Sequence, residues 1–143
     1  MISLSPGGSD ASTMREFCLT TRQFVEPCEG GFAMPRAAKS SVQYRSRDEL
    51  LVGTDFEFDG SSMTDSGYAR VIKSWRRGTP ISEAVTVFEG EQADVAASMY
   101  AYHDRGAVHE FQLRNVTFYT SRADVSFKYL SRARARERER PSY

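Results

Sequence analysis

The chain of 143 residues is short of several features, and each shortage excludes a class of protein. Two cysteines, Cys18 and Cys28, are too few for a fold held together by disulfides, so we expect free thiols. The net charge is zero, because 19 basic residues balance 19 acidic ones, and the chain lacks the strong field of a dedicated nucleic-acid binder. No apolar run approaches the about 18 residues of a membrane-spanning helix. Residues 1–8 also lack the basic start and apolar stretch of a signal peptide, so we expect neither a membrane span nor export.

Catalytic motifs are lacking as well. The sequence contains no phosphate-binding loop, no dinucleotide fingerprint, no nucleophile elbow and no zinc-protease motif. An imidazole is next to a carboxylate only in His103-Asp104 and His109-Glu110, and adjacent side chains point apart on a helix or a strand. Neither pair is therefore a catalytic dyad.

Two candidate metal sites fail on spacing. The stretch 55–61 places acids at the first, third and fifth positions of a calcium loop and Gly60 at the sixth, but the twelfth position, normally a glutamate, is Ser66. Zinc would need ligands from four separate elements: Cys18, Cys28, His103 and His109. We expect neither a metal nor another cofactor.

Short apolar runs and alternating patterns predict about six or seven strands. The segments concerned are 16–25, 42–44, 54–59, 68–75, 82–88, 108–119 and 125–129, and residues 50–52 form a brief apolar run. In the segment 54–59, Phe56 and Phe58 would point inward and the three acids outward. The segment 68–75 also fits a helical stripe, but the glycines that flank it favour a strand.

One helix is predicted, over residues 91–104. A stripe at helical spacing supports it, made of Val95, Ala96, Met99, Tyr100 and His103. Acids at its start, Arg105 at its end and Gly106 after it match the signals that begin and end helices. The expected fold class is therefore α+β and β-rich: an antiparallel barrel or sandwich with this helix inserted before the last strands.

Composition and charge divide the chain into three regions. Residues 1–14 are rich in Ser and Gly and are expected to be a flexible arm, residues 15–131 form a single β-rich domain, and residues 132–143 are a tail of Arg and Glu. Six acids and no base lie from Asp48 to Asp65, and four bases follow without an acid among them. Opposed patches of this kind suit head-to-tail contact between copies of a chain. The candidate assembly contacts are Asp55, Glu57, Asp59, Arg70, Lys73, Arg76, Arg77, Arg132, Arg134 and Arg136.

From residue 82 to residue 130 the predicted order is a strand at 84–88, an acidic entry at 90–92, the helix, an exit at 104–106, a strand at 108–114 and two further strands. This order resembles the second half of phage tail-tube proteins and of the tube protein of type VI secretion systems. The resemblance implies a β-barrel subunit that stacks into rings, is a virion component or lies in the cytoplasm, and has no catalytic residues. We therefore expect a non-enzymatic structural subunit that assembles with copies of itself and with other assembly subunits.

Two other functions stay open. A small α+β barrel with a pocket would bind or transform a small molecule, and its candidate pocket residues are His103, His109 and Asp55. An RNA-binding accessory protein would contact phosphates through the arginine-rich tail and the basic patch from Arg70 to Arg77. It would stack bases on Tyr68, Trp75 or Tyr129. The balanced total charge makes nucleic acid the less expected partner.

Overall fold

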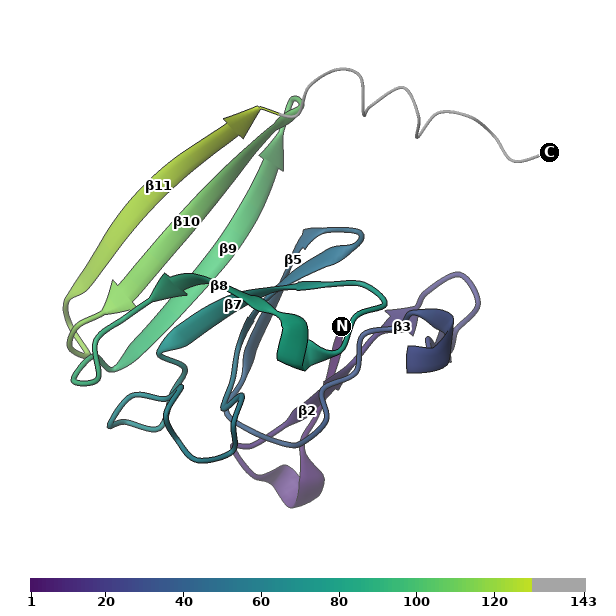
Figure 1. Cartoon of the computed structure of the whole chain (residues 1–143), viewed down its shortest axis with the longest axis horizontal. Coiled ribbons are helices and arrows are strands. Elements are labelled where there is room, and N and C mark those ends of the chain that lie inside the picture. The colour runs from purple at the N-terminus through teal and green to yellow at the C-terminus, as the bar shows by residue number, and fades with distance from the viewer. Residues whose placement is uncertain (130–143) are drawn as a thin grey trace.

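The computed structural model shows an all-β protein with two principal sheets (Figure 1). The structure describes residues 1–129, with the side chains of residues 1–125. Within that part of the chain the helical segments are three single turns of 3-10 helix, at Pro6–Gly8, Pro27–Glu29 and Ile81–Glu83. None of its helices is long and apolar enough to cross a membrane.

The first principal sheet has four antiparallel strands in chain order. They are β5 (Ser41–Ser46), β6 (Glu49–Gly53), β7 (Val71–Arg76) and β8 (Val85–Glu89). In β6 the side chains of Leu50, Leu51 and Val52 are all at most 1% exposed. Because successive side chains of a strand point to opposite faces, this unbroken apolar run shows that both faces of the sheet are covered.

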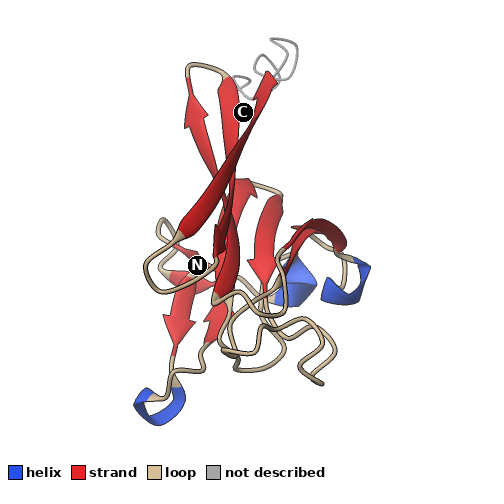
Figure 2. Ribbon diagram, turned by 90° about the vertical axis from the view of Figure 1, so that its left-hand side faces the viewer, coloured by secondary structure: helices blue, strands red, loops and turns tan. Residues whose placement is uncertain are grey.

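The second principal sheet is a three-stranded antiparallel meander in the order β11-β10-β9. Its strands are β9 (Ala96–Asp104), β10 (Ala107–Asn115) and β11 (Ser121–Tyr129), each of nine residues. It forms an elongated panel on one side of the molecule (Figure 1), and the view turned by 90° shows it extending past the rest of the fold at one end (Figure 2). One face of the panel packs on the four-stranded sheet, since Met99 joins a buried cluster with Leu51 and Ile72.

Two short hairpins precede these sheets. In the first, β1 (Ile2–Leu4) pairs with β2 (Thr13–Arg15), and in the second, β3 (Phe17–Cys18) pairs with β4 (Gln23–Phe24). Backbone hydrogen bonds from Glu16 N to Phe32 O and from Met34 N to Met14 O attach them to the loop before β5. Phe32 and Met34 then cover the other face of β6, in a cluster with Leu50 and Trp75. The four-stranded sheet is therefore the middle of three layers.

The expected barrel with an inserted helix is wrong. Residues 96–104 are the strand β9, whose inward side chains include Ala97 and Met99 while Tyr100 and Tyr102 are exposed. Residues of the predicted helical stripe therefore lie on both faces of a strand. Gly106, expected to end a helix, has φ 83° and forms with Arg105 (φ 45°) the two-residue turn of the β9–β10 hairpin. The sheets are open, as in a sandwich.

Two other segments of the described residues, each predicted to be one strand, have a different structure. Residues 54–59 form a bend, in which both carboxylate oxygens of Asp55 accept from the Gly60 amide at 3.1 Å and Phe58 has φ 60°. A local side-chain to backbone hydrogen bond of this type competes with a strand ladder. The segment 16–25 folds back on itself as the β3–β4 hairpin, through a turn in which Arg22 has φ 57°.

Candidate functional site

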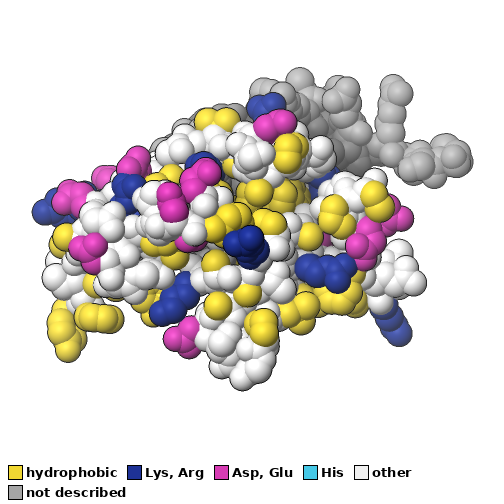
Figure 3. Space-filling model, turned by 60° about the horizontal axis from the view of Figure 1, so that its bottom comes forward, with side chains coloured by type: hydrophobic (Ala, Val, Ile, Leu, Met, Phe, Trp, Pro, Cys, Tyr) yellow, Lys and Arg dark blue, Asp and Glu magenta, His cyan; other side chains and the backbone are white. Residues whose placement is uncertain are grey.

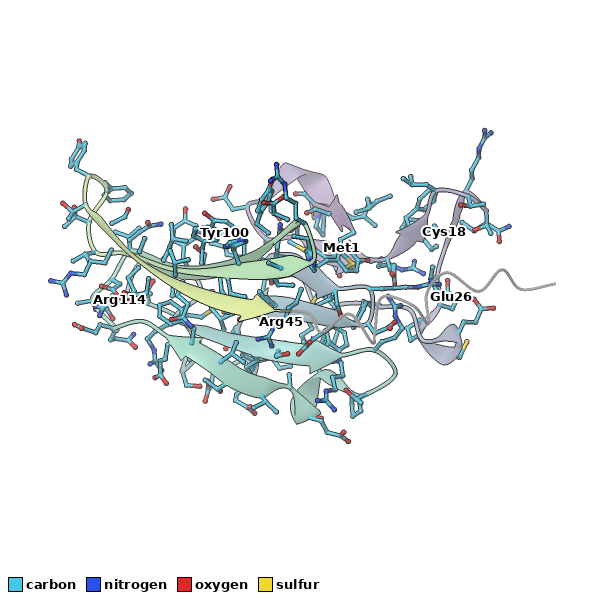
Figure 4. All side chains as sticks on the ribbon, turned by 90° about the horizontal axis from the view of Figure 1, so that it is seen from above. Met1, Cys18, Glu26, Arg45, Tyr100 and Arg114 are labelled. Atoms are coloured by element: carbon cyan, nitrogen blue, oxygen red, sulfur yellow. The ribbon has the colours of Figure 1, made fainter. Side chains whose placement is uncertain are left out.

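A buried ion pair joins the two principal sheets. Arg45 of β5 donates from Nε and Nη2 to the two carboxylate oxygens of Glu110 of β10, at 2.5 and 2.9 Å, and Glu110 is 2% exposed. Arg45 Nη1 also donates to Glu49 at 3.1 Å, and His103 Nε2 bonds with the Arg45 carbonyl oxygen at 2.9 Å. Burial alone would lower the pKa of Arg45, but Glu110 and Glu49 outweigh it and raise that pKa. Figure 4 shows Arg45 between the strands of the two sheets.

A second charged cluster holds the N-terminal hairpins on the middle sheet. The carboxylate of Glu16 accepts from Arg77 at 2.6 and 2.9 Å, from the Tyr44 hydroxyl at 2.9 Å and from the Phe32 amide at 3.1 Å. These donors, Arg77 first, lower the pKa of Glu16 from 4.5 to about 2. Burial, assisted by the Glu16 carboxylate, raises the pKa of Tyr44 to about 12.

A third cluster fastens the loop before β9 to β10. The Asp94 carboxylate, 2% exposed, accepts from Arg114 at 2.7 and 3.0 Å and from the Glu91 amide at 2.8 Å. Arg114 lowers the pKa of Asp94 and has its own pKa raised in turn. All three clusters consist of opposite charges with satisfied hydrogen bonds, which is the arrangement that lets charges be buried.

A hollow of about 330 Å³ opens where the N-terminal segment, the loops before β5 and β7 and the start of β9 meet. Small alanines, Ala69, Ala96 and Ala97, line part of it. Its polar lining is Asp10, Ser12, Lys39, Ser40, Ser41, Tyr68 and Ser98. The Lys39 ammonium lies 4.9 Å from the centre of the Tyr68 ring. A cation, hydroxyl groups and an exposed aromatic ring can together bind a polar ligand such as a short peptide. We call this space the Lys39 hollow.

The face of the β9–β11 sheet that points away from the middle sheet is aromatic. Tyr100 and Phe111, directly opposite in the register, are stacked at 4.8 Å with 11° between their planes. Tyr100, Tyr102 and Val125 are 40%, 59% and 60% exposed. We call this surface the outer face; it presents apolar area that nothing in the described part of the chain covers.

The predicted assembly residues are mostly engaged within the chain. Arg70 bonds with Glu89 and with the Ser61 carbonyl oxygen, Lys73 lies 4.3 Å from the centre of the Phe56 ring, and Arg77 belongs to the Glu16 cluster. Arg76 is exposed at the end of β7. On the face drawn in Figure 3, basic and acidic side chains are interspersed among hydrophobic ones. Whether any of these residues contacts a second copy stays a prediction.

The acidic members of that set lie in the bend between β6 and β7. Asp55 caps Gly60, and Glu57 is exposed. Asp59 accepts from the Ser61 amide at 2.9 Å, and hydrogen bonding by the Ser61 hydroxyl and then by this amide lowers the pKa of Asp59. The tail residues Arg132, Arg134 and Arg136 lie outside the described residues. No group of three or more His, Cys, Asp or Glu in the described residues is arranged to hold a metal ion.

The candidate pocket residues lie on different surfaces. His103 pairs with Val108 and His109 with Tyr102 in the register, so the two imidazoles are on opposite faces of one sheet. Asp55 bonds with Gly60 in the bend after β6. Sequence reasoning missed Arg45, Lys39 and the buried role of Glu110, because their contacts are long-range. The one local signal was an acid, Glu110, among the apolar residues of a strand.

Comparisons with known proteins overturn the resemblance to tube proteins. No family model matches the chain. Over 104 residues, 73% of the chain, it is 36% identical to the uncharacterized peptidase y4nA of Sinorhizobium fredii (strain NBRC 101917 / NGR234), and it spans 14% of that protein. A solved post-proline cleaving enzyme from Rickettsia typhi has a similar fold, with a TM-score of 0.72 and 20% identity over 89% of this chain and 20% of that one.

These similarities correct the functional expectations. The expected tail-tube or type VI tube protein, virion component and non-enzymatic structural subunit are wrong, because the similar proteins are peptidases. The same findings overturn the expectation that the chain has no enzymatic role. The alternative, a protein that binds or transforms a small molecule, agrees better with the similarity to peptidases. The chain spans a seventh to a fifth of the lengths of these two proteins, and its fold is that of the matching part of the Rickettsia enzyme.

Proposed function

We propose that this chain serves peptide hydrolysis, as part of a peptidase of the post-proline-cleaving type, and that its described part binds and positions the peptide. The observation that carries the proposal is the 36% identity to a peptidase over 104 residues. The similarity in fold to a post-proline cleaving enzyme over 89% of the chain supports it independently.

The geometry favours peptide binding as the role of the described residues. Hydrolysis by a serine nucleophile needs a hydroxyl in hydrogen-bond reach of a general base such as histidine. Here His103 Nε2 bonds with a backbone carbonyl oxygen, and the Ser74 hydroxyl bonds with the Glu49 carboxylate beside Arg45. The His103 bond joins the two principal sheets and the Ser74 bond joins β7 to β6, so both groups are engaged in the fold. The Lys39 hollow, in contrast, is open to solvent and large enough for the end of a peptide.

The test is a pair of assays on the purified chain with matched peptides. A fluorescein-labelled peptide with a central Ala-Pro step and one with Ala-Ala in its place are titrated by fluorescence anisotropy, and Gly-Pro and Gly-Ala aminomethylcoumarins are assayed for release. We expect binding that favours the proline peptide; release from the Gly-Pro substrate alone would support the proposal further. A chain that neither binds nor cleaves any of the four, or that treats proline and alanine alike, contradicts it.

A further inference from the structure

The positive charge of Lys39 is only weakly paired within the described part of the chain. Among residues 1–125 the only carboxylate within ion-pair distance is that of Asp10, at 3.8 Å, which is too far for a hydrogen bond. The Asp10 side chain is 86% exposed and therefore well solvated. An ammonium has three donors, and those of Lys39 are held over the Tyr68 ring at the wall of the Lys39 hollow.

The remaining lining supplies hydrogen bonds. Ser12, Ser41 and Ser98 line the hollow. Their hydroxyls form no hydrogen bond with any group in the described part of the chain. Ser40 is different, because its hydroxyl is 2.7 Å from that of Thr54. Three hydroxyls and one cation in the lining can donate to an anionic ligand, and the carboxylate in the same lining, that of Asp10, is 86% exposed to solvent.

We propose that the Lys39 hollow binds the free α-carboxylate at the C-terminal end of a peptide, an inference that rests on the proposed peptide-binding role. Lys39 supplies the charge, the hydroxyls of Ser12, Ser41 and Ser98 donate to the carboxylate oxygens, and the Tyr68 ring packs against the last side chain. A cationic ligand would be repelled by Lys39, and a purely apolar one would leave these donors without acceptors. Small alanines line part of the hollow, whose volume is about 330 Å³.

The test compares peptides that differ only at the end. Three labelled peptides contain the same Ala-Pro core: one ends in a free carboxylate, one in a carboxamide, and one in a carboxamide but with an internal glutamate. We expect the free acid to bind about tenfold more tightly than the amide, as a charged hydrogen-bonded contact would give. Raising the salt from 0.05 to 0.5 M should narrow that difference, because screening weakens a partly exposed charge.

Variants then assign the effect to Lys39. Lys39→Gln should bind acid and amide equally, Lys39→Arg should keep the preference, and the matched control Lys73→Gln, a lysine packed on Phe56 instead, should leave it unchanged. Equal thermal melting curves show that each variant is folded. Equal binding of acid and amide to the wild type overturns the carboxylate site while leaving the proposed function standing. If the internal glutamate binds as well as the free acid, the C-terminal assignment is wrong, and if no peptide binds, the proposed function itself fails.

Discussion

Single residues in this fold show how charge is buried without being left unpaired. Glu110, Asp94 and Glu16 each accept from an arginine through both carboxylate oxygens. The arginines are far away in sequence, with 65 positions between Arg45 and Glu110. Composition predicted only balanced charge, because nothing in a linear pattern specifies which arginine faces which acid.

The Glu16 carboxylate makes stability depend on acidity. Its pKa is about 2 in the folded protein against an ordinary value of 4.5, so its contribution to stability is present above pH 4.5 and is lost as the pH falls toward 2. Replacing it in Glu16→Gln should lower the unfolding free energy by about 2 kcal/mol at pH 7, because hydrogen bonds to a charged group are lost. Urea unfolding at pH 7, 4 and 2.5 should show the difference between variant and wild type shrinking. A difference independent of pH would contradict this account.

The Arg45–Glu110 pair predicts an asymmetry between single and double substitution. Glu110→Leu leaves the Arg45 guanidinium, 16% exposed, without its main partner, and should cost about 3–5 kcal/mol of unfolding free energy. Arg45→Met with Glu110→Leu removes both charges and should recover most of that loss. The surface pair supplies the control, since Glu26→Gln, which breaks the exposed contact with Arg15, should cost less than about 1 kcal/mol. A double variant no more stable than Glu110→Leu would mean that the pair itself stabilises the fold.

At the scale of single elements, sequence reasoning succeeded for the four strands of the middle sheet and for β11. The strands predicted at 42–44, 68–75, 82–88 and 125–129 correspond to β5, β7, β8 and β11, and the apolar run at 50–52 corresponds to β6. It failed for residues 91–104, where apolar residues also fit helical spacing, and for residues 54–59, where an alternating pattern forms a bend instead of a strand. For residues 96–104, pairing with β10 decides between helix and strand, and the partner of a strand cannot be read from the strand's own residues.

The β9–β10 turn offers a test of that hairpin. A type I′ turn needs positive φ at both central positions, which Asn-Gly adopts with less strain than Arg105-Gly106. Arg105→Asn should therefore raise the unfolding free energy by about 0.5–1 kcal/mol, since the Arg105 side chain is 94% exposed and its 3.9 Å contact with Asp104 contributes little. Gly106→Ala should act in the opposite direction. Thermal melting measures both, and a Gly106→Ala variant as stable as the wild type would contradict a turn that needs positive φ at this position.

For the whole molecule, the order of the layers follows from the middle sheet. Leu50 and Val52 face the cluster with Phe32, while Leu51 faces Met99 of the other sheet. The sequence shows the apolar run of β6 but not which segments cover its two faces, because those segments come from both ends of the chain. The Lys39 hollow has the same origin, since residues near positions 10, 39, 68 and 97 meet there through the stacking of layers. No motif search along the chain finds a site assembled in that way.

The outer face predicts how the whole molecule behaves in solution. The two strands β9 and β10 bury one side on the middle sheet and present Tyr100 and Tyr102 to water on the other, a concentration of apolar area typical of a contact surface. The double substitution Tyr102→Ser with Val125→Thr should reduce binding of the dye anilinonaphthalene sulfonate at least twofold, because it removes exposed apolar area. It should change the unfolding free energy by less than about 1 kcal/mol, because both side chains are exposed to solvent. Leu51→Ala, in the core, should instead cost about 2–5 kcal/mol. If Tyr102→Ser with Val125→Thr lowers the unfolding free energy as much as Leu51→Ala does, the side chains of the outer face are buried in solution and this prediction is wrong.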